Sequence, residues 1–209
     1  MSDLQFDIDA VLDRLASDGW VVIPQALPAT LTAALRDACL QVWQEGRFHE
    51  AATGRGDGQA RRAEIRSDSV LWLDQVAEQP AVQAYNAAMD GIMQAVNRGL
   101  YLGLAELESH FAVYPAGAFY KKHLDRFRDD DARTLTTVFY LNEGWPQDAG
   151  GQIRLYLDAD CTQHIDVAPE AGTLVLFLSD RFWHEVLPAN QQRLSVTGWY
   201  RRRVDGVSW

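Results

Sequence analysis

Residues 107–125 read LESHFAVYPAGAFYKKHLD. Two strand-like runs, 107–115 and 118–125, are separated here by a turn that contains glycine. Similar runs follow, each bounded by turn residues rich in glycine, proline or aspartate: 134–142, 151–157, 164–169, 172–179, 184–189 and 193–203. Eight short strands at this spacing are typical of an antiparallel sandwich or barrel of the jelly-roll type, which we expect over residues 105–203.

The first hundred residues follow a different pattern, in which apolar side chains recur at helical spacing. The pattern predicts three amphipathic helices, whose apolar stripes begin at Ile8, Leu31 and Val82. A short strand, WVVI, is cut by a proline between the first two helices. The fold class is therefore mainly β with flanking helices (α+β), organised as a single domain over residues 1–209 in which residues 1–104 give helical support.

A long polar stretch separates the second and third predicted helices. Over about residues 46–68, glycines and mixed charges replace any periodicity. Long loops inside a compact domain are often lids or binding loops, although a plain surface insertion fits equally well. We expect a mobile loop here.

Composition excludes several classes of protein. The 19 basic and 29 acidic side chains give a formal net charge of −10, which disfavours nucleic-acid binding. The two cysteines, Cys39 and Cys161, form no CxxC motif and suit a reducing compartment. The chain begins with an acidic amphipathic segment unlike a signal peptide, and no run is apolar enough to span a bilayer. We expect a cytoplasmic monomer with no membrane partner.

One pair of residues on the quoted stretch has metal-ligand chemistry. His123 and Asp125 lie two apart, so a regular strand presents both side chains on one face. Alone the pair is a weak signal, because a structural hydrogen bond or a solvent-facing strand explains it as well. His184 supplies a third ligand, and two imidazoles with one carboxylate make the facial triad of Fe(II) oxygenases. Zinc would more often take a further histidine or cysteine. The remaining histidines are predicted to be surface or satisfied core residues: His49, His110 and His164.

A basic residue follows the triad in the chain. Arg193 lies in the last predicted strand, where its planar guanidinium can bind a carboxylate through two hydrogen bonds. Ser195 faces the same way and adds a donor. A lone arginine in a strand is usually a surface residue, but after the triad it favours an anchor for a dicarboxylate.

The order HxD, distant His and RxS resembles the Fe(II)/2-oxoglutarate-dependent dioxygenases, whose fold is a distorted double-stranded β-helix with flanking helices. The likeness narrows to prolyl 4-hydroxylases of the hypoxia-inducible-factor type, as a bacterial-type member. Five segments resemble successive strands and turns of that branch: VYPAGAFYKKHLD (113–125), DARTLTTVFYLNEGW (131–145), GGQIRLY (150–156), SDRFWHEVLPA (179–189) and RLSVTGWY (193–200). A sixth, EIRSDSVLWLD (64–74), resembles the segment that closes the substrate loop.

The resemblance also implies residue roles. The catalytic Fe(II) would be held by His123, Asp125 and His184. The 2-oxoglutarate cosubstrate would be bound by Arg193, Tyr140, Tyr114 and Ser195. The cavity that the prolyl ring enters would be lined by Tyr120 and Trp199. The substrate chain or the loop would be positioned by Arg133, Arg66 and Asp68.

The role of Tyr120 conflicts with strand geometry. Tyr120 lies three residues before His123, so a regular strand would place the two side chains on opposite faces. The assignment therefore requires a bulge, or a strand that starts after Tyr120. Otherwise it is wrong.

The activity implied by the resemblance is hydroxylation of a proline in a protein loop, with elongation factor Tu as the candidate substrate. The reaction would consume O2 and 2-oxoglutarate and release succinate and CO2, with ascorbate as an accessory cofactor. Two alternatives stay open. One is an oxygenase of a small molecule such as a free amino acid, and the other is a non-catalytic sensor of oxygen or 2-oxoglutarate.

Overall fold

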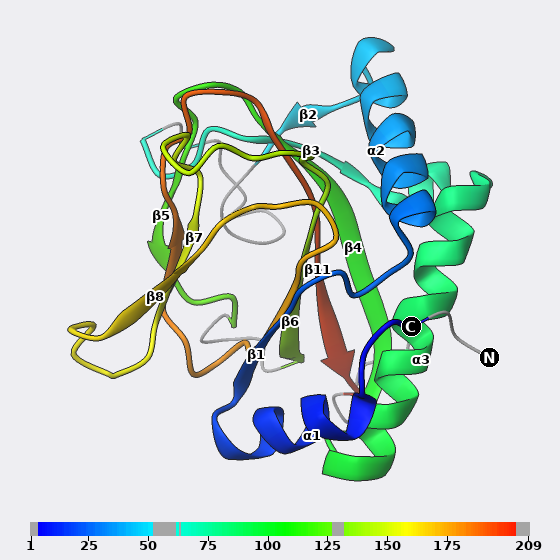
Figure 1. Ribbon diagram of the computed structural model, residues 1–209, viewed down its shortest axis with the longest axis vertical. Coiled ribbons are helices and arrows are strands. Elements are labelled where there is room, and N and C mark those ends of the chain that lie inside the picture. The colour runs from blue at the N-terminus through cyan, green and yellow to red at the C-terminus, as the bar shows by residue number, and fades with distance from the viewer. Residues whose placement is uncertain (1–3, 52–61, 63, 127–131, 204–209) are drawn as a thin grey trace.

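The computed structural model describes residues 4–51, 62, 64–126 and 132–203. Two β-sheets face each other, and helices cover the outer face of the larger one (Figure 1). The helices are α1 (Ile8–Ser17), α2 (Ala29–Gln44), α3 (Pro80–Leu100) and the short 3-10 turn η2 (Leu73–Val76). None of these helices is both long and apolar enough to cross a membrane.

The larger sheet has the strand order β1-β9-β6-β11-β4-β3-β2, and the smaller has the order β5-β10-β7-β8. All the strand pairs within these sheets are antiparallel. The strands are β1 (Trp20–Ile23), β2 (His49–Glu50), β3 (Ser69–Trp72), β4 (Leu104–Tyr114), β5 (Tyr120–His123), β6 (Arg133–Tyr140), β7 (Ile153–Tyr156), β8 (His164–Val167), β9 (Leu174–Leu178), β10 (His184–Val186) and β11 (Arg193–Arg202).

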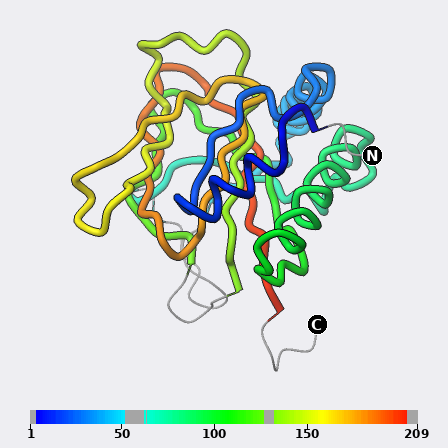
Figure 2. Tube along the Cα trace, turned by 60° about the horizontal axis from the view of Figure 1, so that its bottom comes forward, coloured from blue at the N-terminus to red at the C-terminus, as the bar shows by residue number. Residues whose placement is uncertain are grey.

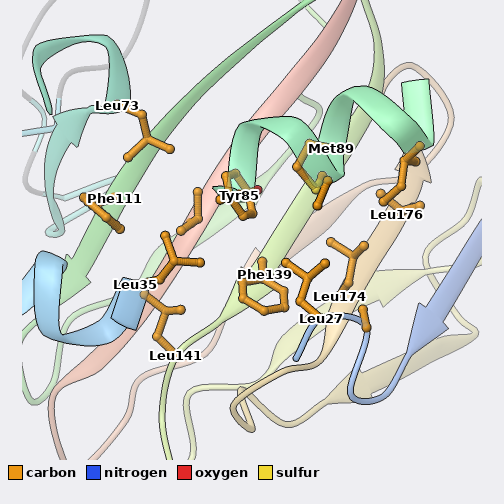
Figure 3. Close-up of a cluster of buried hydrophobic side chains, with 14 of the residues drawn as sticks. Leu27, Leu35, Leu73, Tyr85, Met89, Phe111, Phe139, Leu141, Leu174 and Leu176 are labelled. Atoms are coloured by element: carbon orange, nitrogen blue, oxygen red, sulfur yellow. The ribbon is translucent and has the colours of Figure 1, made fainter. Parts of the chain in front are cut away.

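The main core lies between the helices and the larger sheet. Leu35 from α2, Tyr85 and Met89 from α3, and Phe139 from β6 are fully buried there. Figure 3 shows these side chains between the helices and the sheet. Burial of each such side chain contributes about 1.5–3 kcal/mol. Tyr200 of β11 ties the two layers together, because its hydroxyl donates to the Met89 carbonyl at 2.8 Å. The helices therefore hold the larger sheet from behind and leave its other face for the smaller sheet.

The smaller sheet lies on the side away from the long helices, where the β7–β8 hairpin projects from the molecule (Figure 2). Side chains alternate between the two faces of each strand of the larger sheet. Thus Leu135 and Phe139 of β6 belong to the helix-side core, whereas Val138 and Tyr140 belong to a second core shared with the smaller sheet. The space between the sheets holds the site described below.

The predicted elements are present. All eight strands expected after residue 105 occur, as do the three helices and the short strand that ends before Pro24. The sequence pattern did not predict β2 and β3, which extend the larger sheet beyond β4. Part of the stretch 46–68 is therefore ordered as strand, because His49–Glu50 pairs with Ser69–Val70. Residues 52–61 and 63 of the expected loop lie outside the described residues.

Candidate active site

Three metal-binding side chains converge between the two sheets. His123 ends β5, Asp125 follows it, and His184 begins β10 beside it in the smaller sheet. Asp125 Oδ1 lies 3.5 Å from His123 Nε2, and Asp125 Oδ2 lies 3.4 Å from His184 Nε2. One potential ligand atom from each residue lies within 4.8 Å of the others. This spacing suits three ligands around one ion.

Backbone carbonyls fix the orientation of both imidazoles. His123 Nδ1 lies 2.7 Å from the Lys121 carbonyl, and His184 Nδ1 lies 3.1 Å from the Phe182 carbonyl. A carbonyl only accepts, so Nδ1 of each ring carries the proton and Nε2 carries the lone pair. Two lone pairs and a carboxylate then face one another without a proton between them. A bound cation resolves that repulsion, so the donor set fits a metal ion.

The carboxylate of Asp125 is oriented by a buried chain of hydroxyls. Thr136 Oγ1 on β6 donates to Asp125 Oδ2 at 2.8 Å and lies 2.9 Å from Ser179 Oγ. Burial raises the pKa of Asp125, but the combined effects of His184, His123 and Arg133 outweigh it and hold the pKa below its usual value. Asp125 is therefore ionised, which makes Thr136 the donor to it and Ser179 the donor to Thr136.

The imidazole of His184 is held neutral. Its ring is almost completely buried, and T-shaped packing of Phe177 at 4.8 Å covers one side. Burial lowers the pKa of His184 to about 4, with a further contribution from His123. Metal ions bind the neutral form of imidazole, so at neutral pH this ligand does not have to lose a proton first.

Arg193 forms the cationic end of the same cavity. Its side chain is 1% exposed, and its Nε donates to the Gly151 carbonyl at 2.8 Å. The guanidinium lies 4.9 Å from the ring centres of both Tyr114 and Tyr140. It forms no ion pair with a carboxylate anywhere in the described part of the chain. A buried cation without a counterion fits an anionic ligand.

The residues around Arg193 support that fit. Tyr140 is buried beside Arg193, and its hydroxyl forms no hydrogen bond of regular geometry with the described residues. Burial raises the pKa of Tyr140 and the charge of Arg193 opposes the shift, so the hydroxyl keeps its proton and can donate. Ser195 Oγ lies 3.5 Å from the guanidinium. Gly151 has φ +73°, and a Cβ there would lie 2.9 Å from the Ala189 side chain, so glycine is needed to present the carbonyl to Arg193.

A bulge brings Tyr120 to the metal-binding side. β5 pairs with β10 so that His123 lies opposite His184, while Tyr120 lies opposite Val186. Three steps along β5 therefore match two steps along β10, which reverses the facing of Tyr120. Its ring stacks on His123 with centroids 3.6 Å apart and an angle of 15° between the planes. The irregularity that the sequence required is thus present.

Backbone hydrogen bonds and a ring contact secure the segment before β3 against β5, and a salt bridge lies within that segment. Arg66 binds Asp68 through two hydrogen bonds of 2.8 and 2.5 Å, and its guanidinium lies 4.4 Å from the Tyr120 ring centre. The backbone of Ser67 donates to the Phe119 carbonyl, and that of Lys121 donates to the Ile65 carbonyl. Arg66 and Asp68 therefore lie in a segment that contacts β5, and their expected roles in positioning the substrate chain or the loop stay predictions.

Arg133 and Trp199 close the end of the cavity opposite Arg193. The Arg133 guanidinium lies 3.6 Å from the Trp199 ring centre and donates to Glu108 Oε1 at 2.8 Å. It also donates to the Asp125 carbonyl at 3.4 Å. Trp199 Nε1 is buried and forms no hydrogen bond with the described residues.

The structure brings most of the predicted site residues to one cavity. Eight of them line it: His123, Asp125, His184, Arg193, Tyr114, Tyr120, Trp199 and Arg66. The other four lie behind those residues and contact them or pack beside them: Tyr140, Ser195, Arg133 and Asp68. The sequence analysis missed further lining residues: His110, Thr136, Val138, Ile153, Val186 and Thr197. His110 is 3% exposed, and its Nδ1 has no partner among the described residues, so within the described structure it is neither a surface residue nor a satisfied core residue.

Comparison with known proteins identifies the family. A family model described as the 2OG-Fe(II) oxygenase superfamily matches residues 109–201. A prolyl-4-hydroxylase from Pseudomonas putida, of known crystal structure, is 47% identical, with 95% of this chain and 100% of that chain covered and a TM-score of 0.85. The chain belongs to the 2OG-Fe(II) oxygenase superfamily. The oxygenase therefore has the double-stranded β-helix that the sequence predicted.

Animal relatives of this oxygenase are longer proteins. A hypoxia-inducible factor prolyl hydroxylase from Caenorhabditis elegans is 28% identical over 94% of this chain and 28% of its own length. Egl nine homolog 1 from Homo sapiens is 30% identical over 66% of this chain and 33% of its own length. The chain thus spans about a third of these curated relatives. A Trichoplax adhaerens prolyl hydroxylase, solved with a hypoxia-inducible factor peptide, is 28% identical, with 93% of this chain and 88% of that chain covered and a TM-score of 0.83.

Oxygenases of this superfamily need Fe(II) and 2-oxoglutarate. The donor set of His123, Asp125 and His184 suits Fe(II) because it is a facial triad of two imidazoles and one carboxylate. Arg193 offers a carboxylate group a cation that has no counterion among the described residues. The Tyr140 hydroxyl beside it offers a free hydrogen-bond donor among the same residues. Both cofactors therefore fit the residues that are present.

Proposed function

We propose that this oxygenase hydroxylates C4 of a proline residue in a protein substrate. One observation carries the proposal. The metal triad shares one cavity with a buried Arg193, which has no carboxylate partner among the described residues, and with two aromatic residues: Tyr120, stacked on the ligand His123, and Trp199, six residues along β11 from Arg193. The cationic end suits a carboxylate and the aromatic end suits a prolyl ring. Full-length similarity to a prolyl-4-hydroxylase supports this choice of substrate class.

The residue roles follow from the contacts. His123, Asp125 and His184 would hold Fe(II), with Thr136 fixing the carboxylate. When bound, Fe(II) and 2-oxoglutarate together supply the activation of O2, and 2-oxoglutarate leaves as succinate and CO2.

Arg193 and Tyr140 would bind the carboxylate of 2-oxoglutarate that lies away from the metal, with Ser195 and Tyr114 beside them. The network is buried on all sides. Its hydrogen bonds therefore do not compete with water, and the cosubstrate is held in one orientation.

Tyr120 and Trp199 would position the prolyl ring against the metal. Tyr120 is stacked on the ligand His123, and Trp199 is fixed by the guanidinium of Arg133. These large side chains also exclude water from the reacting carbon. Arg66 and Asp68 would keep the neighbouring segment packed against β5.

Elongation factor Tu is the first protein substrate to test. Purified enzyme with Fe(II), ascorbate and 2-oxoglutarate should add 16 mass units to one of its prolines and form succinate in equal amount, whereas His184→Ala should do neither. The proposal is wrong if no prolyl substrate raises decarboxylation above the background of His184→Ala. An oxygen gain confined to free amino acids or other metabolites in a cell extract would indicate a small-molecule oxygenase. Ligand-dependent partner binding without succinate would indicate a sensor.

A further inference from the structure

His110 is a buried polar residue that the proposed mechanism does not use. It lies on β4, opposite Thr197 of β11 on one side and Trp72 of β3 on the other. Its side chain is on the same strand face as that of Tyr114, so both line the cavity. The ring packs against Trp72 with centroids 5.0 Å apart and against Trp199 with centroids 5.5 Å apart.

The imidazole is buried without a hydrogen bond at Nδ1. His110 is 3% exposed, and none of the residues that the structure describes pairs with its buried Nδ1. Buried polar groups in native proteins are nearly always satisfied, and each exception calls for an explanation such as a missing ligand. The ring itself lines the cavity beside Trp199, so a group that fills this end of the cavity can reach the imidazole and hydrogen-bond it.

The ring is neutral. Burial lowers the pKa of His110 to about 3, and the charges of Arg66 and Arg133 add to the effect. A neutral imidazole offers one donor and one acceptor. The amide that follows a proline offers both functions in return, whereas the amide that precedes it offers only its carbonyl, because the proline nitrogen carries no hydrogen.

The nearby cations are already neutralised. Arg66 is paired with Asp68, and Arg133 is paired with Glu108. The end of the cavity that contains His110 therefore differs from the end that contains Arg193, which has no carboxylate partner among the described residues. A carboxylate would gain little beside His110, whereas an uncharged polar group would satisfy it.

We propose that His110 is a specificity-determining residue that hydrogen-bonds one of the two peptide amides flanking the target proline. The inference rests on the proposed prolyl hydroxylation. It explains how the pocket would select a proline inside a chain, because free proline replaces both amides by charged groups. Trp72 and Trp199 hold the imidazole in place from opposite strands, so it can recognise the amide without moving.

A double-mutant cycle between enzyme and substrate tests the inference. The protein is loaded with Mn(II) and 2-oxoglutarate, so that no turnover occurs, and titrated with a prolyl peptide of elongation factor Tu. Two analogues of the peptide carry an alkene in place of one flanking amide each. His110→Leu removes the hydrogen bond, and His110→Gln keeps a donor and an acceptor. His164→Leu, at an exposed histidine on β8, is the matched control.

His110→Leu should weaken binding of the natural peptide about 5- to 50-fold, with partial recovery in His110→Gln. One alkene analogue should bind wild-type protein more weakly by a similar factor and should lose nothing further in His110→Leu, because the variant has already lost the partner. The affinities for Mn(II) and 2-oxoglutarate should stay unchanged, which separates recognition from misfolding.

If replacing either amide by an alkene weakens peptide binding to His110→Leu as much as it weakens binding to wild type, the two losses are independent. That result would overturn the inference and leave prolyl hydroxylation standing. Turnover of free proline with no turnover of any prolyl peptide would overturn both. If His110→Leu unfolds before it can be assayed, His110→Gln takes its place. The loss of affinity that the alkene analogue causes must then be smaller in His110→Gln than in wild type.

Discussion

Replacing Thr136 by valine removes a single hydroxyl from behind the metal site. That hydroxyl donates to Asp125 Oδ2 at 2.8 Å and accepts from Ser179 Oγ at 2.9 Å. Both Thr136 and Ser179 are almost fully buried, so water cannot replace the lost bond. Valine keeps the branched shape and the strand preference of threonine, so the backbone of β6 should not change.

The size of the effect follows from the charge of the acceptor. A hydrogen bond to an ionised group is worth about 1.5–3 kcal/mol, which corresponds to a factor of about 10–150 in an equilibrium constant. Loss of a hydrogen-bond partner behind a metal ligand typically costs about 10–100-fold in metal affinity. We expect Thr136→Val to weaken Mn(II) binding by about 10–100-fold, since its Asp125 is no longer held toward the two imidazoles.

Calorimetric titration of metal-free protein with Mn(II) measures this directly. The matched control is Thr137→Val, at the next residue of β6. Thr137 faces the helices instead of the cavity, and its buried hydroxyl has no regular hydrogen bond with the part of the chain that the structure describes. Thr137→Val should bind Mn(II) within about twofold of wild type. Equal affinities in wild type and Thr136→Val, or equal losses in both variants, would refute the reasoning.

Three further predictions concern the two ends of the cavity. Arg193→Met should raise the KM for 2-oxoglutarate by about 100-fold, because a buried charged pair is lost, while Mn(II) affinity without 2-oxoglutarate is unchanged. Glu108→Gln should weaken the hold on Arg133 and raise the KM for a prolyl peptide about fivefold at constant KM for 2-oxoglutarate. The pKa of His110 is about 3 in the folded protein, lower than its value of 6.5 in the unfolded chain. The unfolded chain therefore binds an extra proton, and the stability of the fold falls as pH falls from 6.5 toward 3. Urea titrations should show wild type losing about 2 kcal/mol more than His110→Leu between pH 7 and pH 5.

The sequence predicted those features that depend on local periodicity. A two-residue strand repeat identifies the eight strands, and the same repeat places His123 and Asp125 together. His184 and Arg193 could be added because each begins one of those strands and because their side chains suit a metal ion and a carboxylate, respectively. The pattern failed for β3, whose four residues show no alternation and become strand only through pairing with β4.

Features that depend on contacts between strands could not be predicted. Thr136 meets Asp125 across 11 residues of chain, and Glu108 meets Arg133 across 25. The bulge at Tyr120 depends on the register between β5 and β10, which no local pattern reveals. His110 was misjudged because a lone histidine carries no signal of its own. Its even spacing from Tyr114 was the available clue, since the two residues share a strand face.

The two ends of the cavity differ in whether their cations are paired with a carboxylate. Arg66 and Arg133 each have a carboxylate within the fold, whereas Arg193 has none among the described residues. Of these three arginines, only Arg193 therefore offers a full charge interaction to a dicarboxylate, which fixes the direction of the dicarboxylate. The aromatic end, with its cations satisfied, stays available to an uncharged chain. Pairing with Asp68 and Glu108 neutralises Arg66 and Arg133, so neither cation competes with Arg193 for a carboxylate of 2-oxoglutarate.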